Sequence, residues 1–349
     1  MSTIGLAVIG AGYWGPNLVR TALATPALHL EWLCDLDVGR AEAVLGPSTT
    51  VRVTASYETI LADPAVAAVA IATPADTHFD LVRAALEAGK HVLVEKPLTP
   101  SLAEGEKLAA LARRLGLVLM CDHTYCYTPA VQRIRELVLG GHIGEIQFVD
   151  SVRINLGLVQ PDVDVLWDLA PHDLSILDFV LPAEVVPVAV AAHAGDPIGA
   201  GRACMAYLSV WLSNGALAHI HVNWLSPTKI RTTVFGGSRR TIVWDDMNPS
   251  ARLAIHDRGV DRMSAGSLPR AERRQALISY RTGDTLIPAL PEREALMAVM
   301  AEFSAAIAER RSPLTDAGAG LRVLAMLEAA SRSVDNNGAR ISIVTGANR

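Results

Sequence analysis

The sequence has too few cysteines, and these too scattered, for a disulfide scaffold or a zinc site. Only four of the 349 residues are cysteine, and no two of them form a C-x-x-C pair. Such sparse thiols are typical of a reduced protein in the cytoplasm rather than a secreted one. We therefore expect a cytoplasmic location, no metal site and free thiols at Cys34, Cys121, Cys126 and Cys204.

An excess of positive charge is also lacking. The chain has 31 Lys and Arg against 36 Asp and Glu, which gives a formal net charge of −5 at pH 7. Nucleic acids and anionic membranes attract strongly basic surfaces, and a chain so nearly balanced does not provide one. We therefore expect neither a nucleic-acid partner nor a membrane partner.

Long apolar runs are missing as well. The longest stretch without a charged residue, residues 203–228, carries Ser, Asn, Gly and His throughout. It is a poor membrane span and a better hairpin, with Asn214 and Gly215 at the turn between two alternating runs. The N-terminal MSTIGLAVIGAG has no basic leader and no small-residue cleavage site, so we interpret it as a strand rather than a signal peptide.

The chain does contain enough apolar sequence for about two domains, since half of its residues are hydrophobic. In residues 1–122, apolar runs rich in β-branched residues alternate with helical patterns. This alternation predicts βαβ units and a parallel sheet. The strands are expected at Ile4–Ile9, Leu28–Cys34, Val66–Ala72, His91–Val94 and Leu117–Cys121.

Residues 123–349 have a different pattern, in which long strands joined by short turns predict an antiparallel sheet. The strands are expected at Ile146–Asn155, Val185–Ala192, Cys204–Leu212, Ala216–Trp224, Ile230–Phe235 and Thr241–Trp244. Helices are expected at Pro129–Leu139, near Pro171–Leu181 and as a pair between Glu292 and Asn336, broken at residues 311–313. Residues 257–287 are polar and are expected to form a long irregular loop.

A glycine motif, G-A-G-Y-W-G, follows the first predicted strand and opens the first predicted helix. Gly10 permits a tight turn, Gly12 lets the main chain approach a pyrophosphate, and Gly15 lets helix and strand pack closely. Pro16 suits the first turn of that helix, whose free N–H groups would face the phosphates. We therefore interpret residues 1–122 as a dinucleotide-binding domain.

An acidic residue about twenty positions beyond the glycines takes the ribose hydroxyls in such domains. Asp35 stands at this distance, at the end of the second predicted strand, and the next arginine is Arg40. Its carboxylate, with help from that of Asp37, would repel a 2′-phosphate, so the sequence favours NAD over NADP.

A second motif, Glu95-Lys96-Pro97, ends the strand of "HVLVEKPLT". Ligands bind at the carboxyl edge of open parallel sheets, so Lys96 is expected to place an ammonium group in the cleft. The Lys-Pro bond also allows a cis peptide. On this stretch alone, a surface lysine at a strand end is an equally good interpretation.

These motifs in this order resemble the Gfo/Idh/MocA oxidoreductases: G-A-G-Y-W-G, then "ATPADTH", then "EKP", then a D-x-x-x-H in "LWDLAPHDLSILDFVL". The resemblance covers essentially the whole chain and is nearest to the branch of nucleotide-sugar 3-dehydrogenases that act on UDP-N-acetylglucosamine derivatives. It implies an N-terminal Rossmann domain, residues 1–122, and a C-terminal α/β domain, residues 123–349, with a large, open, mostly antiparallel sheet. That sheet commonly forms homodimers or homotetramers in the family.

By this resemblance, Lys96, Asp168 and His172 form the catalytic set. Oxidation of a sugar hydroxyl needs a group that removes the O–H proton, and histidine suits that role near neutral pH. We expect His172 to be the base and Lys96 to bind the reacting oxygen, with Asp168 binding a neighbouring hydroxyl or orienting the pair. Lysine as the base stays open, as do a simple helix cap for Asp168 and a satisfied buried histidine for His172.

Further site residues are expected around this set. On the cofactor side they are Tyr13, Trp14, Thr73, Pro74, His78 and Glu95, and on the substrate side Tyr125, Arg153 and Asn155. His123 reaches the ligand or only packs at the domain junction. Thr128 stands where similar family members usually have Asn, which puts any contact there in doubt.

The expected function is NAD-dependent hydride transfer between nicotinamide and a sugar carbinol or ketone, at C3 of a nucleotide-linked hexose. Four alternatives stay open: a ketoreductase of a 3-keto sugar, an inositol-type polyol dehydrogenase, a glycosidase that uses NAD transiently, and a non-catalytic dinucleotide-binding regulator. A regulator has no need of a proton-transfer set, which argues against the last.

Overall fold

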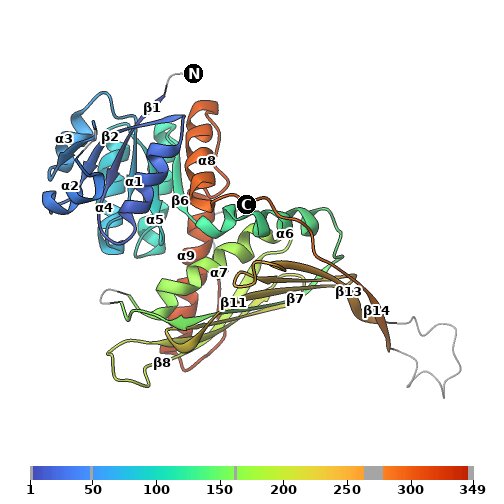
Figure 1. Cartoon of the computed structure of the whole chain (residues 1–349). Coiled ribbons are helices and arrows are strands. Elements are labelled where there is room, and N and C mark those ends of the chain that lie inside the picture. The colour runs from blue at the N-terminus through green and yellow to red at the C-terminus, as the bar shows by residue number, and fades with distance from the viewer. Residues whose placement is uncertain (1–2, 48–49, 161–162, 263–277, 345–349) are drawn as a thin grey trace, which may run out of the picture.

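The structure is a computed structural model that describes residues 3–47, 50–160, 163–262 and 278–344 (Figure 1). Its N-terminal half contains a six-stranded sheet in the order β3-β2-β1-β4-β5-β6, and all of its pairings are parallel. The strands are β1 (Ile4–Ile9), β2 (Leu28–Cys34), β3 (Arg52–Thr54), β4 (Ala68–Ile71), β5 (His91–Glu95) and β6 (Leu119–Asp122).

Helices cover both faces of this sheet because successive strand residues point to opposite sides. Leu6 and Val8 of β1 pack in one hydrophobic core with Leu18 of the first helix, whereas Ala7 and Ile9 pack in a second core with the helices after β4 and β5. The helices are α1 (Gly15–Ala24), α2 (Val38–Leu45), α3 (Tyr57–Ala62), α4 (His78–Glu87) and α5 (Leu102–Leu115). The predicted doubly wound Rossmann sheet is confirmed.

The second sheet has nine strands in the order β14-β13-β12-β11-β7-β10-β9-β8-β15. Its one parallel pairing among the described strands joins β10 to β7, so the predicted mostly antiparallel sheet is confirmed. The strands are β7 (Ile146–Leu156), β8 (Pro187–Gly195), β9 (Met205–Leu212), β10 (Leu217–Asn223), β11 (Leu225–Gly237), β12 (Thr241–Asp245), β13 (Leu253–Arg262), β14 (Ile278–Leu286) and β15 (Ile341–Ser342).

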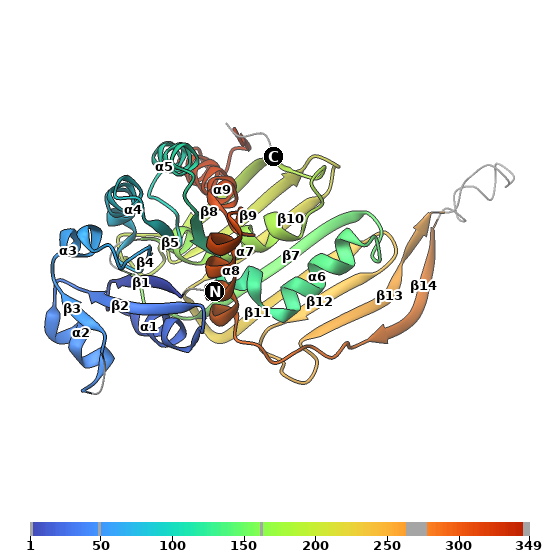
Figure 2. The ribbon, with the colours of Figure 1, turned by 90° about the horizontal axis from the view of Figure 1, so that it is seen from above.

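Helices α6 (Pro129–Leu139) and α7 (Val165–Val180) lie over one face of this sheet (Figure 2). The predicted turn at Asn214 and Gly215 joins β9 to β10, and Gly215 has a φ of +87° that suits glycine. Alternate residues of β10 point away from the helices, which places His219 and His221 beside Tyr207 on the outer face.

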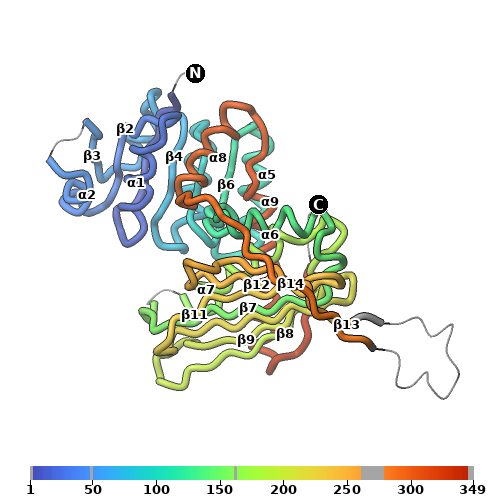
Figure 3. The backbone as a smooth tube through the Cα atoms, turned by 45° about the vertical axis from the view of Figure 1, so that its right-hand side comes forward, coloured from blue at the N-terminus to red at the C-terminus, as the bar shows by residue number. Residues whose placement is uncertain are grey.

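Two helices near the C-terminus join the halves. Helix α8 (Ala295–Glu309) packs against α1, and α9 (Ala317–Asp335) packs against α5 and β6 (Figure 3). A Cβ at Gly105 of α5 would lie 2.9 Å from Leu321 and 3.0 Å from Leu324, so this glycine permits the close approach of α9. The boundary between the two predicted domains is therefore a packed one.

Two predictions about the elements were wrong, and two short strands, β3 and β15, were missed. Part of residues 257–287 forms β13 and β14 rather than a loop; residues 263–277 lie outside the described residues. Strand β3 is only three residues long. Helix α7 begins at Val165 instead of near Pro171, because Asp164 caps it by accepting a bond from the Trp167 amide at 2.9 Å.

Candidate active site

The glycine loop lies between β1 and α1. A Cβ at Gly10 would come within 2.6 Å of the Ala72 carbonyl oxygen, and one at Gly15 within 2.1 Å of the Gly10 oxygen, so both positions require glycine for close packing. A Cβ at Gly12 would meet nothing within 4 Å, so the loop is open on that side. The N-cap residue of α1, Trp14, makes no side-chain capping bond, which leaves the helix end available to an anion. The loop therefore fits a dinucleotide pyrophosphate.

Asp35 follows β2 directly and is 8% exposed. Its Oδ2 accepts a hydrogen bond from the Ala11 amide at 2.6 Å, and its Oδ1 accepts from the Asp37 amide at 2.8 Å and from Arg40 Nη2 at 2.7 Å. Burial alone would raise the pKa of Asp35, but these three hydrogen bonds outweigh it and hold the pKa below its ordinary value. An ionised carboxylate therefore stands beside the glycine loop, next to the half-exposed side chain of Arg40.

Lys96 and Asp168, which are 72 residues apart in the sequence, meet at the carboxyl edge of the Rossmann sheet. Lys96 follows β5, and its bond to Pro97 is cis. Lys96 Nζ donates to Asp168 Oδ1 at 2.9 Å and to the Asp168 carbonyl at 2.8 Å, while Asp168 Oδ2 accepts from Trp224 Nε1 at 3.1 Å. Asp168 lies in the first turn of α7, so it is not the cap of this helix.

His172 lies one turn after Asp168 on the same helix, as the four-residue spacing predicts. Its ring meets the Tyr125 ring edge-to-face, with centroids 5.0 Å apart. Burial lowers the pKa of His172 well below its ordinary value, and the charges of Lys96 and Arg153 lower it further. The imidazole is therefore neutral near pH 7 and able to accept a proton.

The second sheet forms the other wall of the site. Arg153 of β7 is 2% exposed and forms a bidentate pair with Asp173, at 2.7 and 3.2 Å, while its guanidinium lies 4.3 Å from the Tyr125 ring centre. Arg231 of β11 is its cross-strand partner and lies 3.7 Å from Asp246. Like charges in register on neighbouring strands oppose folding unless each has a counter-ion, which these two aspartates supply.

The remaining predicted residues lie around this centre. Thr73 and Pro74 follow β4, and Asn155 follows Arg153 on β7. The His78 ring is 1% exposed and contacts the carbonyls of Pro97 at 2.8 Å and Thr73 at 3.0 Å, so it acts on the cleft through the backbone that it holds. The others are Tyr13, which is exposed, Trp14 and Tyr125, which are partly buried, and His123, which is buried. Burial lowers the pKa of His123 to about 4.

Three residues of the site could not be predicted from the sequence, and the role of a fourth position was left in doubt there. Trp224 fixes Asp168, Asp173 pairs with Arg153, and Arg231 stands beside Arg153. Asp173 follows His172 directly, which was the available signal; the other two depend on strand register. Thr128 serves as the cap of α6, since its Oγ1 accepts from the Val131 amide at 3.4 Å.

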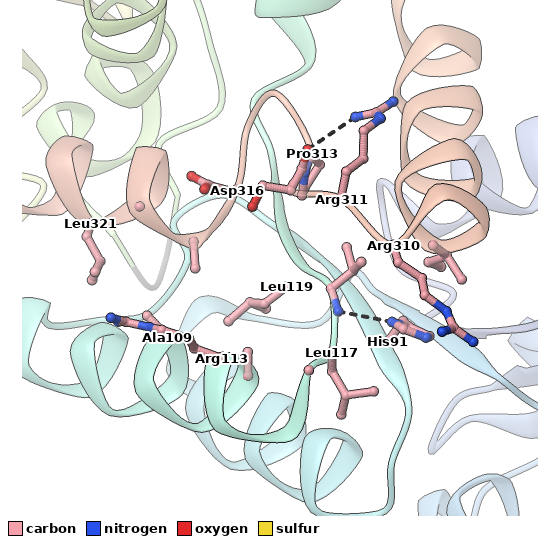
Figure 4. A pocket seen from close by; sticks show the side chains of 17 residues that line it. His91, Ala109, Arg113, Leu117, Leu119, Arg310, Arg311, Pro313, Asp316 and Leu321 are labelled. Carbon is pink, nitrogen blue, oxygen red and sulfur yellow. Dashed lines mark hydrogen bonds between the residues drawn. The ribbon is translucent and has the colours of Figure 1, made fainter. Parts of the chain in front are cut away.

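A cavity of about 640 Å³ lies elsewhere, between the loops around Gly116 and Pro313 (Figure 4). His91, at the start of β5, lines it, so it opens at the sheet edge opposite Lys96. Within the described ranges, no group of three or more His, Cys, Asp or Glu is placed to hold a metal ion. None of the helices in the described part of the chain is both long and apolar enough to cross a membrane.

Comparisons with known proteins match both halves of the chain. Residues 4–123 match the family model described as an oxidoreductase family with an NAD-binding Rossmann fold, and residues 131–242 match the GFO/IDH/MocA C-terminal domain. UDP-N-acetylglucosamine 3-dehydrogenase of Acidithiobacillus ferrooxidans is 30% identical over 321 residues, which is 91% of this chain and 93% of that protein. The NAD⁺-dependent scyllo-inositol 2-dehydrogenase of Bacillus subtilis is 29% identical over 52% of this chain and 55% of its own length.

Solved structures of similar fold agree with these sequence matches. The structure of GnnA, the same A. ferrooxidans enzyme, superimposes with a TM-score of 0.79 at 27% identity and covers 96% of this chain and 99% of its own. GenD2 from gentamicin A biosynthesis, in complex with NAD, has a TM-score of 0.80 at 24% identity and covers 99% of this chain and 97% of its own, which shows a shared fold.

Proposed function

The chain belongs to the Gfo/Idh/MocA family of NAD-binding oxidoreductases, and from this membership we propose that it transfers a hydride between a nicotinamide cofactor and C3 of a nucleotide-linked hexose. The observation that carries the proposal is the Lys96–Asp168 ion pair one helical turn from a neutral His172, at the sheet edge that also holds the glycine loop. Similarity to UDP-N-acetylglucosamine 3-dehydrogenase over nearly the whole chain supports this substrate class.

Each residue has a separate task in this proposal. His172 accepts the proton of the reacting hydroxyl, and Lys96 donates a hydrogen bond to its oxygen. Asp168 orients the Lys96 ammonium and is itself held by Trp224. The bound dinucleotide supplies the hydride acceptor or donor.

The residues on the cofactor and substrate sides also have separate tasks in this proposal. Gly10, Gly12, Gly15, Tyr13 and Trp14 hold the pyrophosphate, and Asp35 binds the ribose hydroxyls. Thr73, Pro74, His78 and Glu95 shape the nicotinamide side, and Tyr125, Arg153 and Asn155 form the substrate side. We propose a cytoplasmic enzyme, because its sparse thiols are typical of reduced proteins.

We also propose a homodimer or homotetramer built through the outer face of the nine-stranded sheet. That face exposes Phe148 of β7 and Leu217 of β10, which are in register with each other, together with Tyr207 of β9. Exposed apolar side chains on one face of a sheet favour burial against a second copy.

A panel of nucleotide sugars and free polyols, with NADH absorbance as the readout, tests the substrate. We expect turnover with UDP-linked N-acetylhexosamines and a much lower kcat/KM with free sugars. Turnover restricted to free polyols would contradict the proposal and favour the inositol-type alternative, which the similarity to scyllo-inositol 2-dehydrogenase supports. Cleavage of a glycoside without net change in NADH would identify the glycosidase alternative.

Asp35→Asn should shift the cofactor preference toward NADP. The amide oxygen still accepts the bond from the Ala11 amide, but the charge that repels a 2′-phosphate is gone and Arg40 loses its ion-pair partner. Hydrogen bonds to charged groups contribute about 1.5–3 kcal/mol, so the ratio of kcat/KM for NAD to that for NADP should fall about tenfold or more.

Asp37→Asn is the matched control. It removes the same charge two residues further on, and asparagine caps α2 as well as aspartate does. We expect a smaller change in the NAD-to-NADP ratio there. An unchanged ratio in Asp35→Asn would show that Asp35 does not read the ribose.

A further inference from the structure

Two carboxyl groups lie side by side directly behind Lys96. Glu95 ends β5, Asp122 ends β6, and the two residues are register partners in this parallel pair. Asp122 is 1% exposed, and Oε1 of Glu95 and Oδ2 of Asp122 are both shielded from solvent. The sequence alone assigns no role to Asp122 and places Glu95 only near the cofactor.

Each carboxyl group has one oxygen with a donor and one without. Glu95 Oε2 accepts from the Lys96 amide at 3.3 Å, and Asp122 Oδ1 accepts from Thr124 Oγ1 at 2.8 Å. Glu95 Oε1 and Asp122 Oδ2 are buried and have no donor among the described residues, although the two side chains stand on register partners of neighbouring strands. Two carboxyl oxygens can bond to each other only when a proton lies between them.

The electrostatics of the pair agree with one bound proton. Burial raises the pKa of Glu95 well above its ordinary value and the charge of Asp122 raises it further; burial also raises the pKa of Asp122. Two adjacent buried carboxyl groups do not both ionise, and they titrate as a unit. Of the other ionisable groups nearby, Cys121, Cys126 and Tyr127 are kept neutral by burial, which raises the pKa of each. Burial lowers the pKa of His123, the residue after Asp122, to about 4, so this group is neutral at higher pH.

We propose that Glu95 and Asp122 share one proton and serve as a positioning pair for Lys96. The pair accepts a hydrogen bond from the Lys96 amide and keeps a single negative charge behind the Lys96 ammonium group. This role rests on the proposed function, in which Lys96 binds the reacting oxygen. Asp122 acts only through its neighbours, since its side chain accepts a hydrogen bond from Thr124 and stands beside its register partner Glu95.

The shared proton can be measured without any substrate. Isolated carboxyl groups lose their protons near pH 4, so above this pH the folded pair holds one proton more than the unfolded chain. The contribution of the pair to stability therefore falls as pH rises, until the raised pKa of the pair is passed. Asp122→Asn removes this proton, because its amide group donates to an ionised Glu95. Over this window the folding equilibrium constant of the wild type should fall about tenfold per pH unit relative to the variant.

Kinetics test the positioning role. Asp122→Asn keeps one hydrogen bond and one negative charge, so kcat with the preferred substrate should stay near the wild-type value. Asp122→Leu leaves Glu95 without a partner in an apolar site, where it takes up a proton and the charge behind Lys96 disappears. We expect kcat to fall about tenfold or more, with a smaller change in KM.

Asp178→Asn is the matched control for the pH slope. Asp178 is also buried, but it pairs with Arg322 at 2.7 and 2.8 Å and so needs no shared proton. This variant should be less stable and keep the wild-type slope. If the folding equilibrium constant of Asp122→Asn depends on pH as steeply as that of the wild type, the two carboxyl groups do not share a proton. If kcat is equal in Asp122→Asn and Asp122→Leu, the pair does not position Lys96. The slope is independent of activity, so its outcome stands apart from that of the proposed function.

Discussion

Lys96→Met is expected to lower kcat by about a hundredfold or more, because positioned proton-transfer and hydrogen-bonding groups contribute that much. Methionine keeps the length and the apolar stem of lysine, but it cannot donate a hydrogen bond to the reacting oxygen. Asp168 loses two contacts from the ammonium group and keeps the bond from Trp224, so α7 retains its anchor. Steady-state rates with saturating cofactor measure the loss.

The same variant should also move the pH profile. Burial lowers the pKa of His172, and the charge of Lys96 is the next cause. Oxidation requires a neutral His172, so the rate falls as the pH drops through its pKa. Without the Lys96 charge this pKa rises, and the acid limb of kcat/KM should move to higher pH in the residual activity.

Lys107→Met is the control for the loss of a lysine. The Lys107 ammonium lies 5.9 Å from the Phe79 ring on the surface of the Rossmann half, away from Asp168. Lys107→Met should leave both kcat and the pH profile of kcat/KM unchanged. Full activity in Lys96→Met on the true substrate would refute the assignment of Lys96.

The Rossmann half could be predicted because its first strands are rich in apolar residues. Strand β1 is a continuous buried apolar run, and in β2 the apolar residues alternate with His29 and Glu31, so Ile4–Ile9 and Leu28–Cys34 coincide with β1 and β2. In the other half, the helix Pro129–Leu139 was equally clear, because Thr128 and Pro129 mark its start and Gly140 its end.

Each wrongly predicted element has a physical reason of its own. Strands β13 and β14 lie at the edge of the nine-stranded sheet and carry charged and polar residues, so they show no apolar alternation. In α7 the proline falls inside the helix, where Asp164 rather than Pro171 determines the start. A proline is a good indicator of a first turn only when no better cap precedes it.

In the candidate site, residues that share one strand or one helix could be predicted from the sequence. Contacts between residues of different strands could not. Asp168 and His172 share α7, so their spacing was sufficient. The neighbours Arg153 and Arg231 share only a register between β7 and β11, and Glu95 with Asp122 only a register between β5 and β6. Register depends on packing of both strands, which the local sequence does not encode.

His172→Ala is the second substitution with a large expected effect. In the oxidative direction the hydroxyl proton has no other positioned acceptor in the proposed mechanism, so kcat should fall about a hundredfold or more. The acid limb that belongs to His172 should disappear from the profile of kcat/KM. Added imidazole, which fits the space left by the ring beside Tyr125, should restore part of the rate.

His221→Ala separates this effect from the loss of any histidine near the sheet. His221 stacks on Tyr207, with ring centroids 4.4 Å apart, on the outer face of β10, so its removal should leave kcat unchanged. If the acid limb survives in His172→Ala and is lost in Lys96→Met, the base is the lysine. The neutral imidazole then only orients the substrate, and the two variants together decide which of the pair moves the proton.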